Sequence, residues 1–490
     1  MKGDGDSLWA MSKTFRPWDV DQAWLLPPSV QDFVPAKHVA HFVRETVRSE
    51  LDLSAIFASY EEERGYPPYH PAMMVALLLY GYSRGVYSSR QLERACEERV
   101  DFMAVTGMNR PDFHTIAAFR RRHLAALGGL FVQVLKLCEK AGLVKLGHVA
   151  LDGTKIKANA SKHKAMSYER MEKRAAELEA EVAKWLSSAE AADAGEDKLY
   201  GRDKTGEEMP DWVTDKKRRA ETIRAAKAAL EAEAKAAAEA KVKEEAAAEE
   251  KRQAEGRKKP GRKAAPPSGE PDPKAQKNFT DPESRIMKSK DGFVQAFNAQ
   301  AAVDAEAQII VAQAVTQDAN DRRQLAPMTD AIETNLGRKP EQLSADSGYC
   351  SNANIEALET RGIDGYIAPG RTKDTADGAA EASMAAPPAD ASATASPEPA
   401  SAPTRVEAMR EKIKAGGHDS PYRLRKQLPE PVFGQIKQAR GFRQFLLRGL
   451  EKVHAEWSMV CTAHNLLKLA QRRTLSALRS MARKARPAVA

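Results

Sequence analysis

The chain has 490 residues, enough for two or three domains with a substantial hydrophobic core. Its formal net charge is +8, but 76 Lys and Arg stand against 68 Asp and Glu, so total charge alone does not establish nucleic-acid binding. The four cysteines show no CxxC spacing, which argues against a disulfide framework and a zinc site and fits a reducing cytoplasm. The N-terminus lacks the layout of a signal peptide, and the longest apolar stretch, residues 72–80, is too short to span a bilayer. We therefore expect a cytoplasmic protein with no membrane partner.

Residues 15–140 are expected to form an all-helical domain. Pro71 begins a helix with apolar residues at helical spacing, and SSRQLERACEE forms a shorter helix with a serine cap. After the turn GMNRPD, one more helix covers HTIAAFRRRHLAAL and carries three arginines: Arg120, Arg121 and Arg122. This order resembles a helical DNA-binding module, but a helical bundle with solvated basic residues accounts for it equally well.

A strand is expected over residues 147–160, which read HVALDGTKIKANA. Alternation along the strand places Lys155 and Lys157 on one face and Asp152 and Thr154 on the other.

Residues 161–275 read as a helical insertion followed by a basic linker. Met171, Leu178 and Trp185 recur every seven residues, as in a coiled coil. Residues 211–255 contain no Gly or Pro and predict a helix roughly 65–70 Å long. Large apolar residues are sparse in it, so most of this helix should be exposed. The flexible basic stretch that follows could contact phosphates, but a solvated linker is the favoured interpretation.

The segments FVQAFNAQAAVD and AQIIVAQAVTQ alternate in polarity and are joined by a short turn, which predicts an antiparallel hairpin. A helix near 321–336, a strand at 342–346, a helix near 352–362 and a strand over DGYIAP follow. This order describes a mixed sheet with helices packed on it.

Residues 373–404 are rich in Ala, Ser and Pro and are expected to be a disordered linker. A long amphipathic helix should follow, marked by Phe442, Phe445, Leu446, Leu450, Val453 and Trp457. Residues 471–490 form a basic tail.

Three carboxylates stand out against this background. Asp152 and Asp346 each follow a short apolar run, so each should lie at or near the end of a strand. Glu430 precedes Pro431 at the start of a helix, with Lys437 on the same side. Acids on neighbouring strands can share a site for two hard cations roughly 3.5–4 Å apart. Taken singly, each acid is as easily a turn former, a cap or a helix N-terminal acid, so the residues alone indicate only a possible metal site.

Several blocks, in order, resemble bacterial insertion-sequence DDE transposases. They are VALDGTKIKANAS, SADSGYCS, YRLRKQLPEPVFGQIKQARGFRQFLLRGLEKVHAEW and, near the N-terminus, YHPAMMVALLLYGYSRGVYSSRQLERACEERVDFMAVTG. The likeness covers roughly residues 15–170, 276–372 and 405–470. It implies an α/β fold: an RNase H-like mixed-sheet core from residues 147–160, 276–372 and 405–470, with a helical insertion and a preceding all-α domain.

The resemblance also implies a function and a site. Asp152, Asp346 and Glu430 would be the catalytic metal ligands for two Mg²⁺ or Mn²⁺ ions. The enzyme would cleave DNA at the terminal inverted repeats of an insertion sequence and transfer the strand into target DNA. A homodimer or larger assembly, associated with the nucleoid, is expected because both ends of the element must be held together.

The family's signature around the glutamate is Tyr, two residues, Arg, three residues, Glu, six residues, Lys. Tyr422 with Arg425 and Glu430 with Lys437 fit, but four residues separate Arg425 from Glu430, and Lys426 occupies the three-residue position. Either basic residue could therefore contact the phosphate. The expected DNA-contacting residues are Tyr422, Arg425, Lys426, Lys437, Lys155, Lys157, Arg120, Arg121 and Arg122.

Two alternatives remain open from the sequence. A nuclease on the same core would cut DNA without joining it. A transposase-derived DNA-binding regulator would keep the N-terminal helices and need no metal.

Overall fold

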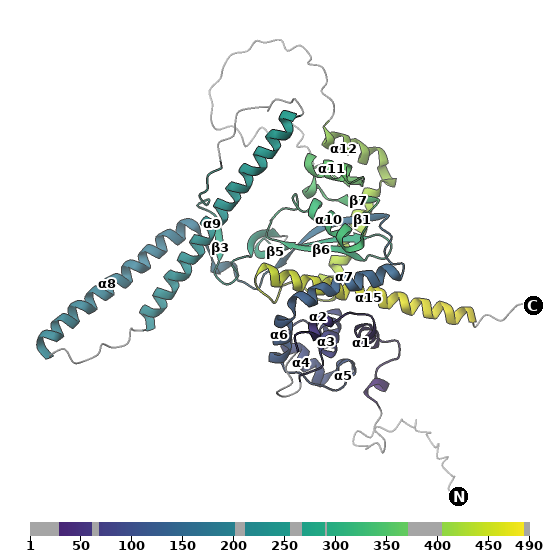
Figure 1. The fold of residues 1–490 in the computed structure, drawn as a ribbon, viewed down its shortest axis with the longest axis horizontal. Coiled ribbons are helices and arrows are strands. Elements are labelled where there is room, and N and C mark those ends of the chain that lie inside the picture. The colour runs from purple at the N-terminus through teal and green to yellow at the C-terminus, as the bar shows by residue number, and fades with distance from the viewer. Residues whose placement is uncertain are drawn as a thin grey trace, which may run out of the picture.

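The computed structural model describes residues 29–60, 68–200, 211–254, 267–289, 292–370 and 404–484. Figure 1 shows a helical N-terminal part below a central sheet, and a long helical hairpin that projects to one side. The predicted linker over residues 373–404 lies outside these ranges except for Thr404, which caps a helix. In the part of the chain that the structure describes, no helix is long and apolar enough to cross a membrane.

The N-terminal part is helical, as predicted. Its elements are η1 (Val30–Phe33), α1 (Val39–Ser49), α2 (Ser54–Phe57), α3 (Pro71–Ser83), α4 (Ser89–Glu98), α5 (Val100–Thr106), α6 (Phe113–Arg122) and α7 (Leu124–Lys140). Helix α3 is apolar on nearly every side and is buried among the others. The helix predicted through HTIAAFRRRHLAAL is wrong as a single element, because the backbone at His123 (φ −108°, ψ 23°) separates α6 from α7.

Strand β1 (His148–Lys157) is at the centre of a mixed sheet. It pairs antiparallel with β5 (Gly292–Asp304) and parallel with β7 (Gln342–Ala345). The sheet order is β4–β5–β1–β7–β8, and β6 also pairs with β5. The remaining strands and their connecting helices are β4 (Arg285–Ser289), β6 (Ile310–Thr316), α10 (Leu325–Leu336), η3 (Ser347–Tyr349), α11 (Asn352–Thr360) and β8 (Asp364–Ile367). The predicted hairpin and mixed α/β sheet are confirmed.

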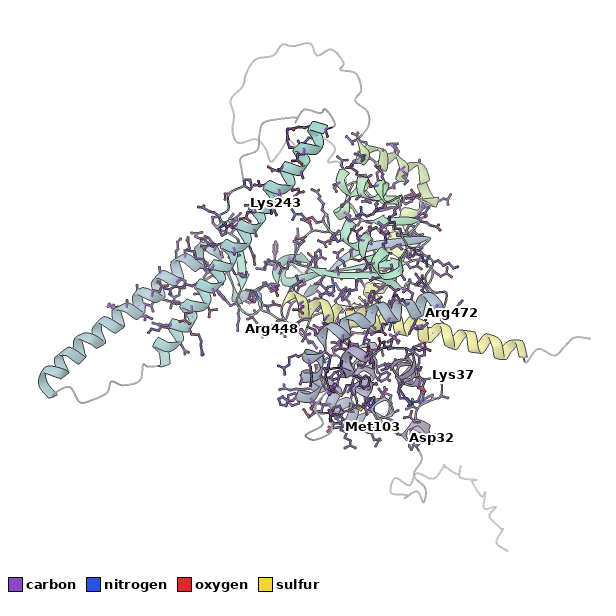
Figure 2. The ribbon with its side chains drawn as sticks, viewed as in Figure 1. Asp32, Lys37, Met103, Lys243, Arg448 and Arg472 are labelled. Carbon is purple, nitrogen blue, oxygen red and sulfur yellow. The ribbon has the colours of Figure 1, made fainter. Side chains whose placement is uncertain are left out.

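The insertion forms an arm of two helices, α8 (Tyr168–Tyr200) and α9 (Asp211–Ala254), that runs away from the sheet (Figure 1). At its base, η2 (Lys162–Lys164) leads into β2 (Ala165–Ser167), which pairs with β3 (Gln276–Asn278). The arm has its own apolar cluster, separate from the main core: Met171, Ala175, Leu178, Ala220, Ile223, Ala226 and Leu230. Beyond this cluster α9 lies beside residues 267–275 and pairs through Glu233 with Lys277 and Arg285, and it then continues along the stretch where Figure 2 labels Lys243.

The C-terminal part returns to the sheet through α12 (Arg405–Gly416), η4 (Gly417–Asp419), η5 (Pro421–Arg423), α13 (Leu424–Gln427), α14 (Pro429–Gly434), the π-helix η6 (Gln435–Ala439) and α15 (Leu450–Lys484). Helix α15 packs against β6 and against α3 and α7, so it joins the sheet to the N-terminal helices. The helix expected to include Phe442 and Phe445 is wrong at its start. Both residues lie in a non-helical segment whose backbone bonds to the end of β1.

Candidate active site

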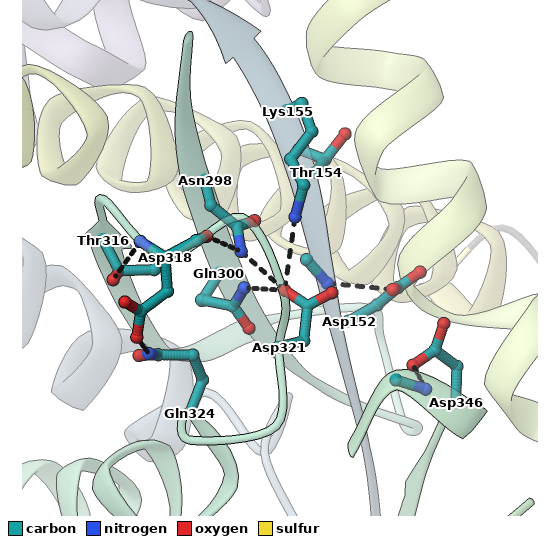
Figure 3. A network of polar contacts seen from close by, with 12 residues as sticks. Asp152, Thr154, Lys155, Asn298, Gln300, Thr316, Asp318, Asp321, Gln324 and Asp346 are labelled. Atoms are coloured by element: carbon teal, nitrogen blue, oxygen red, sulfur yellow. Dashed lines mark hydrogen bonds and ion pairs between the residues drawn. The ribbon is translucent and has the colours of Figure 1, made fainter. Parts of the chain in front are cut away.

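Asp152 and Asp346 come from adjacent parallel strands. Leu151 of β1 is in register with Ala345 of β7, so the two acids are the next residues on neighbouring strands. Asp152 Oδ1 accepts a hydrogen bond from the backbone N–H of Gly153 (2.8 Å). Asp346 caps η3, where its Oδ1 accepts from the N–H of Gly348 (2.8 Å). Figure 3 shows the carboxylates of Asp152 and Asp346 close together.

The environment of Asp152 is unfavourable to its negative charge. Burial raises the pKa of the Asp152 carboxyl to about 6, and the neighbouring Asp346 carboxylate adds to the effect. The Gly153 N–H and the Arg425 guanidinium act in the opposite direction. A pair of partly buried carboxylates of this kind supplies the hard oxygen donors that Mg²⁺ and Mn²⁺ prefer, and a cation would relieve the repulsion between them. The residues therefore fit a divalent cation.

Glu430 is in the first turn of α14, and its side chain is exposed. Helix α14 packs on β5 and on β1, the strand that carries Asp152. Even so, among the described residues no group of three or more His, Cys, Asp and Glu side chains is arranged to hold a metal ion. The structure thus brings together two of the three predicted ligands and leaves the third on a neighbouring helix.

Arg425 and Lys426 differ sharply in environment. The Arg425 side chain is 17% exposed, with Nη2 3.9 Å from Asp346 Oδ2 and Nη1 3.5 Å from the hydroxyl of Tyr422. Its Nε is buried and has no hydrogen-bond partner among the described residues. Lys426 is exposed. Of the two basic candidates, Arg425 is the one beside the carboxylates.

Lys437 contacts the strand that carries Asp152. Its Nζ donates to the hydroxyl of Thr154 and to the carbonyl of Lys155 (2.9 Å). Lys437 lies within the π-helical segment η6, where the wider turn changes the direction of side chains relative to an α-helix.

The two lysines of β1 have separate environments. Lys155 Nζ is 3.5 Å from a carboxylate oxygen of Asp321, and its side chain is 18% exposed. Lys157 has an exposed side chain, while its backbone bonds to Arg443 and Phe445.

The three arginines of α6 are not equivalent. Arg120 is 5% exposed, donates to the carbonyl of Tyr87 (3.0 Å) and is close enough to the buried Glu456 to lower its pKa. In this structure Arg120 binds a backbone carbonyl and is enclosed by protein, and its role as a DNA contact stays a prediction. Arg122 is exposed but lies over the ring of Tyr60 (4.9 Å). Arg121 is exposed.

Five other acids are competing carboxylates in the sequence: Asp281, Glu283, Asp304, Glu451 and Glu456. Glu451 is exposed in the first turn of α15. The other four accept hydrogen bonds from backbone N–H groups and hold a turn or a helix start in place.

Sequence reasoning missed Asp321, in the loop between β6 and α10. Its Oδ1 accepts hydrogen bonds from Asn298 Nδ2 (2.6 Å) and Gln300 Nε2 (2.7 Å). Figure 3 shows this carboxylate between Gln300 and Asp152. The run QDANDRRQ carried no signal for it, because acids in loops are common.

Two family models match the chain. Residues 28–122 match a transposase domain (DUF772), and residues 269–466 match a transposase DDE domain. The second match includes Asp346 and Glu430 but begins after the arm, so Asp152 precedes it. Comparisons with curated proteins and with solved structures find no match.

Proposed function

Because this chain belongs to the DDE transposases of insertion sequences, we propose that Asp152, Asp346 and Glu430 form its catalytic centre for DNA cleavage and strand transfer. The observation that carries the proposal is the pairing of β1 with β7. This pairing makes neighbours of two acids far apart in the chain, and each is partly buried at the same edge of the sheet.

Two divalent cations at such a centre would neutralise charge on the phosphodiester and polarise the attacking oxygen. Asp152 and Asp346 would hold them from the sheet. Glu430 would complete the set from α14, which already packs on β1. Mg²⁺ and Mn²⁺ fit this all-carboxylate donor set.

The basic residues around the acids would bind the DNA backbone. Arg425, with its unpartnered buried Nε, would contact a phosphate at the reacting position, assisted by Tyr422. Lys437 would hold the strand edge beside Asp152. The exposed side chains of Lys157, Arg121 and Lys426 would contribute phosphate contacts farther away.

The reaction would proceed in two displacements at one site. Water attacks the phosphorus at the end of the element, the P–O3′ bond breaks, and the 3′-oxygen leaves as a hydroxyl. That hydroxyl then attacks a phosphorus of the target DNA and releases a target 3′-hydroxyl. Catalysis consists of positioning and charge stabilisation, so it needs no covalent protein intermediate. A homodimer or larger assembly would hold both ends.

The test is in vitro end cleavage and strand transfer with Mg²⁺ or Mn²⁺ on DNA bearing the element's terminal repeats. Asp152→Asn, Asp346→Asn and Glu430→Gln should keep end binding and lose cleavage and joining by more than about 100-fold, beyond the loss typical of an outer-shell residue. Asp330→Asn, an exposed acid paired with Arg361, is the control. Cleavage at the control's rate in either aspartate variant would refute the assignment. Cleavage without joined product would make the wild type a nuclease.

A further inference from the structure

Asp321 lies directly against the backbone of the strand that carries Asp152. Asn298 and Gln300, whose amides donate to it, are fully buried on β5. The register of β5 on β1 places Gln300 opposite Gly153 and Asn298 opposite Lys155. A Cβ added to Gly153 would be 2.3 Å from Gln300 Nε2 and 2.5 Å from Asp321 Oδ1. A Cβ at this residue, one position after Asp152, would therefore displace the Gln300 amide and the Asp321 carboxylate from their present positions.

The same carboxylate is linked to the segment that carries Asp346. Gln300 Oε1 accepts a hydrogen bond from the hydroxyl of Tyr349, a fully buried residue in the turn that Asp346 caps. A carboxylate can only accept, so Asp321 fixes which end of the Gln300 amide faces it and leaves the amide oxygen for Tyr349. In addition, Asp321 Oδ2 lies close to the backbone of Gly348 in the same turn, since a Cβ added to Gly348 would be 3.6 Å from it.

The loop that carries Asp321 is itself held at several points. The N–H of Asp318 donates to Thr316 Oγ1 (3.0 Å), and Asn298 Nδ2 donates to the carbonyl of Asp318 (3.1 Å). Gln324 Nε2 donates to Asp318 Oδ2 (2.9 Å), and the Gln324 N–H donates to the carbonyl of Asp321 (2.9 Å). The Asp321 carboxylate therefore has a fixed place in the network (Figure 3).

We propose that Asp321 is a positioning residue of the catalytic centre, which sets the spacing of Asp152 and Asp346 from outside the ligand set. It acts on β1 through Gly153 and Lys155, and on the Asp346 turn through Gln300 and Tyr349. Partners of this kind orient the groups that bind a metal, and their loss typically costs about 10–100-fold in metal affinity or activity. The inference rests on the proposed function, because it takes Asp152 and Asp346 as the ligands.

The experiment measures Mn²⁺ affinity of the full chain from the electron paramagnetic resonance signal of free Mn²⁺, together with end cleavage. Asp321→Ala should weaken Mn²⁺ binding and cleavage by about 10–100-fold. Asp321→Asn keeps an acceptor oxygen for both amides, so it should recover most of the affinity. Asp330→Ala, at an exposed acid of α10 that pairs with Arg361 and takes no part in this network, is the control and should bind as the wild type does. Tyr349→Phe removes only the hydroxyl that links Gln300 to the Asp346 turn and should weaken binding severalfold.

The outcomes separate the two proposals. If Asp152→Ala binds Mn²⁺ as tightly as the wild type, the proposed function fails. If Asp152→Ala is defective while Asp321→Ala is normal, only the positioning role fails. An Asp321→Asn variant as weak as Asp152→Ala would make Asp321 a ligand and also overturn the positioning role. If Asp321→Ala does not fold, Tyr349→Phe decides, and wild-type affinity in that variant overturns the inference.

Discussion

Arg425 and Lys426 are neighbours in the chain with opposite environments. Arg425 is mostly enclosed beside Asp346, while Lys426 faces solvent. A guanidinium held at such a place can contact a phosphate with more than one N–H, which an exposed lysine cannot replace.

Arg425→Ala should therefore lower end cleavage by about 10–100-fold, the effect of losing one or two charge-assisted hydrogen bonds. Lys426→Ala should reduce end binding slightly and leave the cleavage rate of bound DNA unchanged. Single-turnover cleavage at saturating protein measures the cleavage rate of bound DNA for both variants. The dependence of that rate on protein concentration measures end binding. Equal losses in the two variants would show that enclosure beside Asp346 has no functional consequence.

Glu456 is a fully buried acid whose burial raises its pKa to about 7, although the N–H groups of Leu446 and Leu447 bond to its carboxylate. The native state therefore binds the proton of the Glu456 carboxyl more tightly than the unfolded chain does. The stability that this proton binding contributes is fully present below the ordinary glutamate pKa and is lost as pH rises through about 7.

Glu456→Gln removes this titration. The stability of the wild type relative to Glu456→Gln should be greater by about 2–3 kcal/mol at about pH 5 than at about pH 8. Thermal or urea unfolding of both proteins at the two pH values measures the difference. A constant difference would show that Glu456 keeps its ordinary pKa.

At the level of single residues, the sequence predicts some positions well and others not at all. Asp346 directly follows the strand that its apolar run predicted, whereas Asp152 lies within β1, which continues to Lys157, so its expected place at a strand end is wrong. Asp321 was not, since its partners on β5 are assembled only by tertiary folding. The burial of Arg120 likewise depends on its contact with Tyr87.

At the scale of elements, the segment 440–449 connects the helix of Glu430 to the N-terminal helices. Tyr87 donates from its hydroxyl to the carbonyl of Arg440 (3.0 Å), and its ring packs edge-on against Phe442. Gly85, with a φ of 76°, allows this close approach, because a Cβ there would be 2.6 Å from the carbonyl oxygen of Arg440.

Gly85→Ala should therefore push this segment away and lower both stability and end cleavage. Gly142→Ala is the matched control, since Gly142 also has a positive φ (71°) but no atom within 4 Å of its added Cβ. The control should lose only the cost of backbone strain, about 1 kcal/mol, and should cleave normally. Thermal unfolding and single-turnover cleavage compare the two. Equal destabilisation with equal activity would exclude the proposed link between the N-terminal helices and the Glu430 helix.

Strands were more predictable than the ends of helices. Polarity alternation located β5 and β6, whereas Phe442 and Phe445 have helical spacing but do not lie in a helix. Gly441 and Gly449 have positive φ and bracket the segment, and its backbone bonds to β1 instead. Period alone cannot distinguish apolar residues of a packed loop from one face of a helix.

At the scale of the whole molecule, the arm is a separate packing unit. Its apolar cluster does not merge with the main core, and its two ends meet where β2 pairs with β3. Ser167 is in register with Gln276, a spacing that a two-residue turn can close.

Replacing residues 168–275 by Asn-Gly should therefore leave the sheet and the N-terminal helices folded. The melting temperature should fall by less than about 8 °C, because only the contacts at the base are lost, which corresponds to about 1–2 kcal/mol. Circular dichroism and thermal unfolding test this. Glu233→Ala in the full chain measures two of those contacts together, because Glu233 pairs with both Lys277 and Arg285. An aggregated or helix-only product would show that the arm is required for the sheet to form.

The order of the sheet also has a consequence during synthesis. β1 leaves the ribosome early but lies between β5 and β7, which are made much later, and the Glu430 helix later still. At roughly 5–20 residues per second, the interval between Asp152 and Glu430 takes tens of seconds. Until residue 304 has been made, β1 has neither neighbouring strand, and a chain that stops before Glu430 lacks one acid of the proposed centre. If Glu430 acts as proposed, translation products that stop before it would be unable to cut the DNA of the cell that makes them.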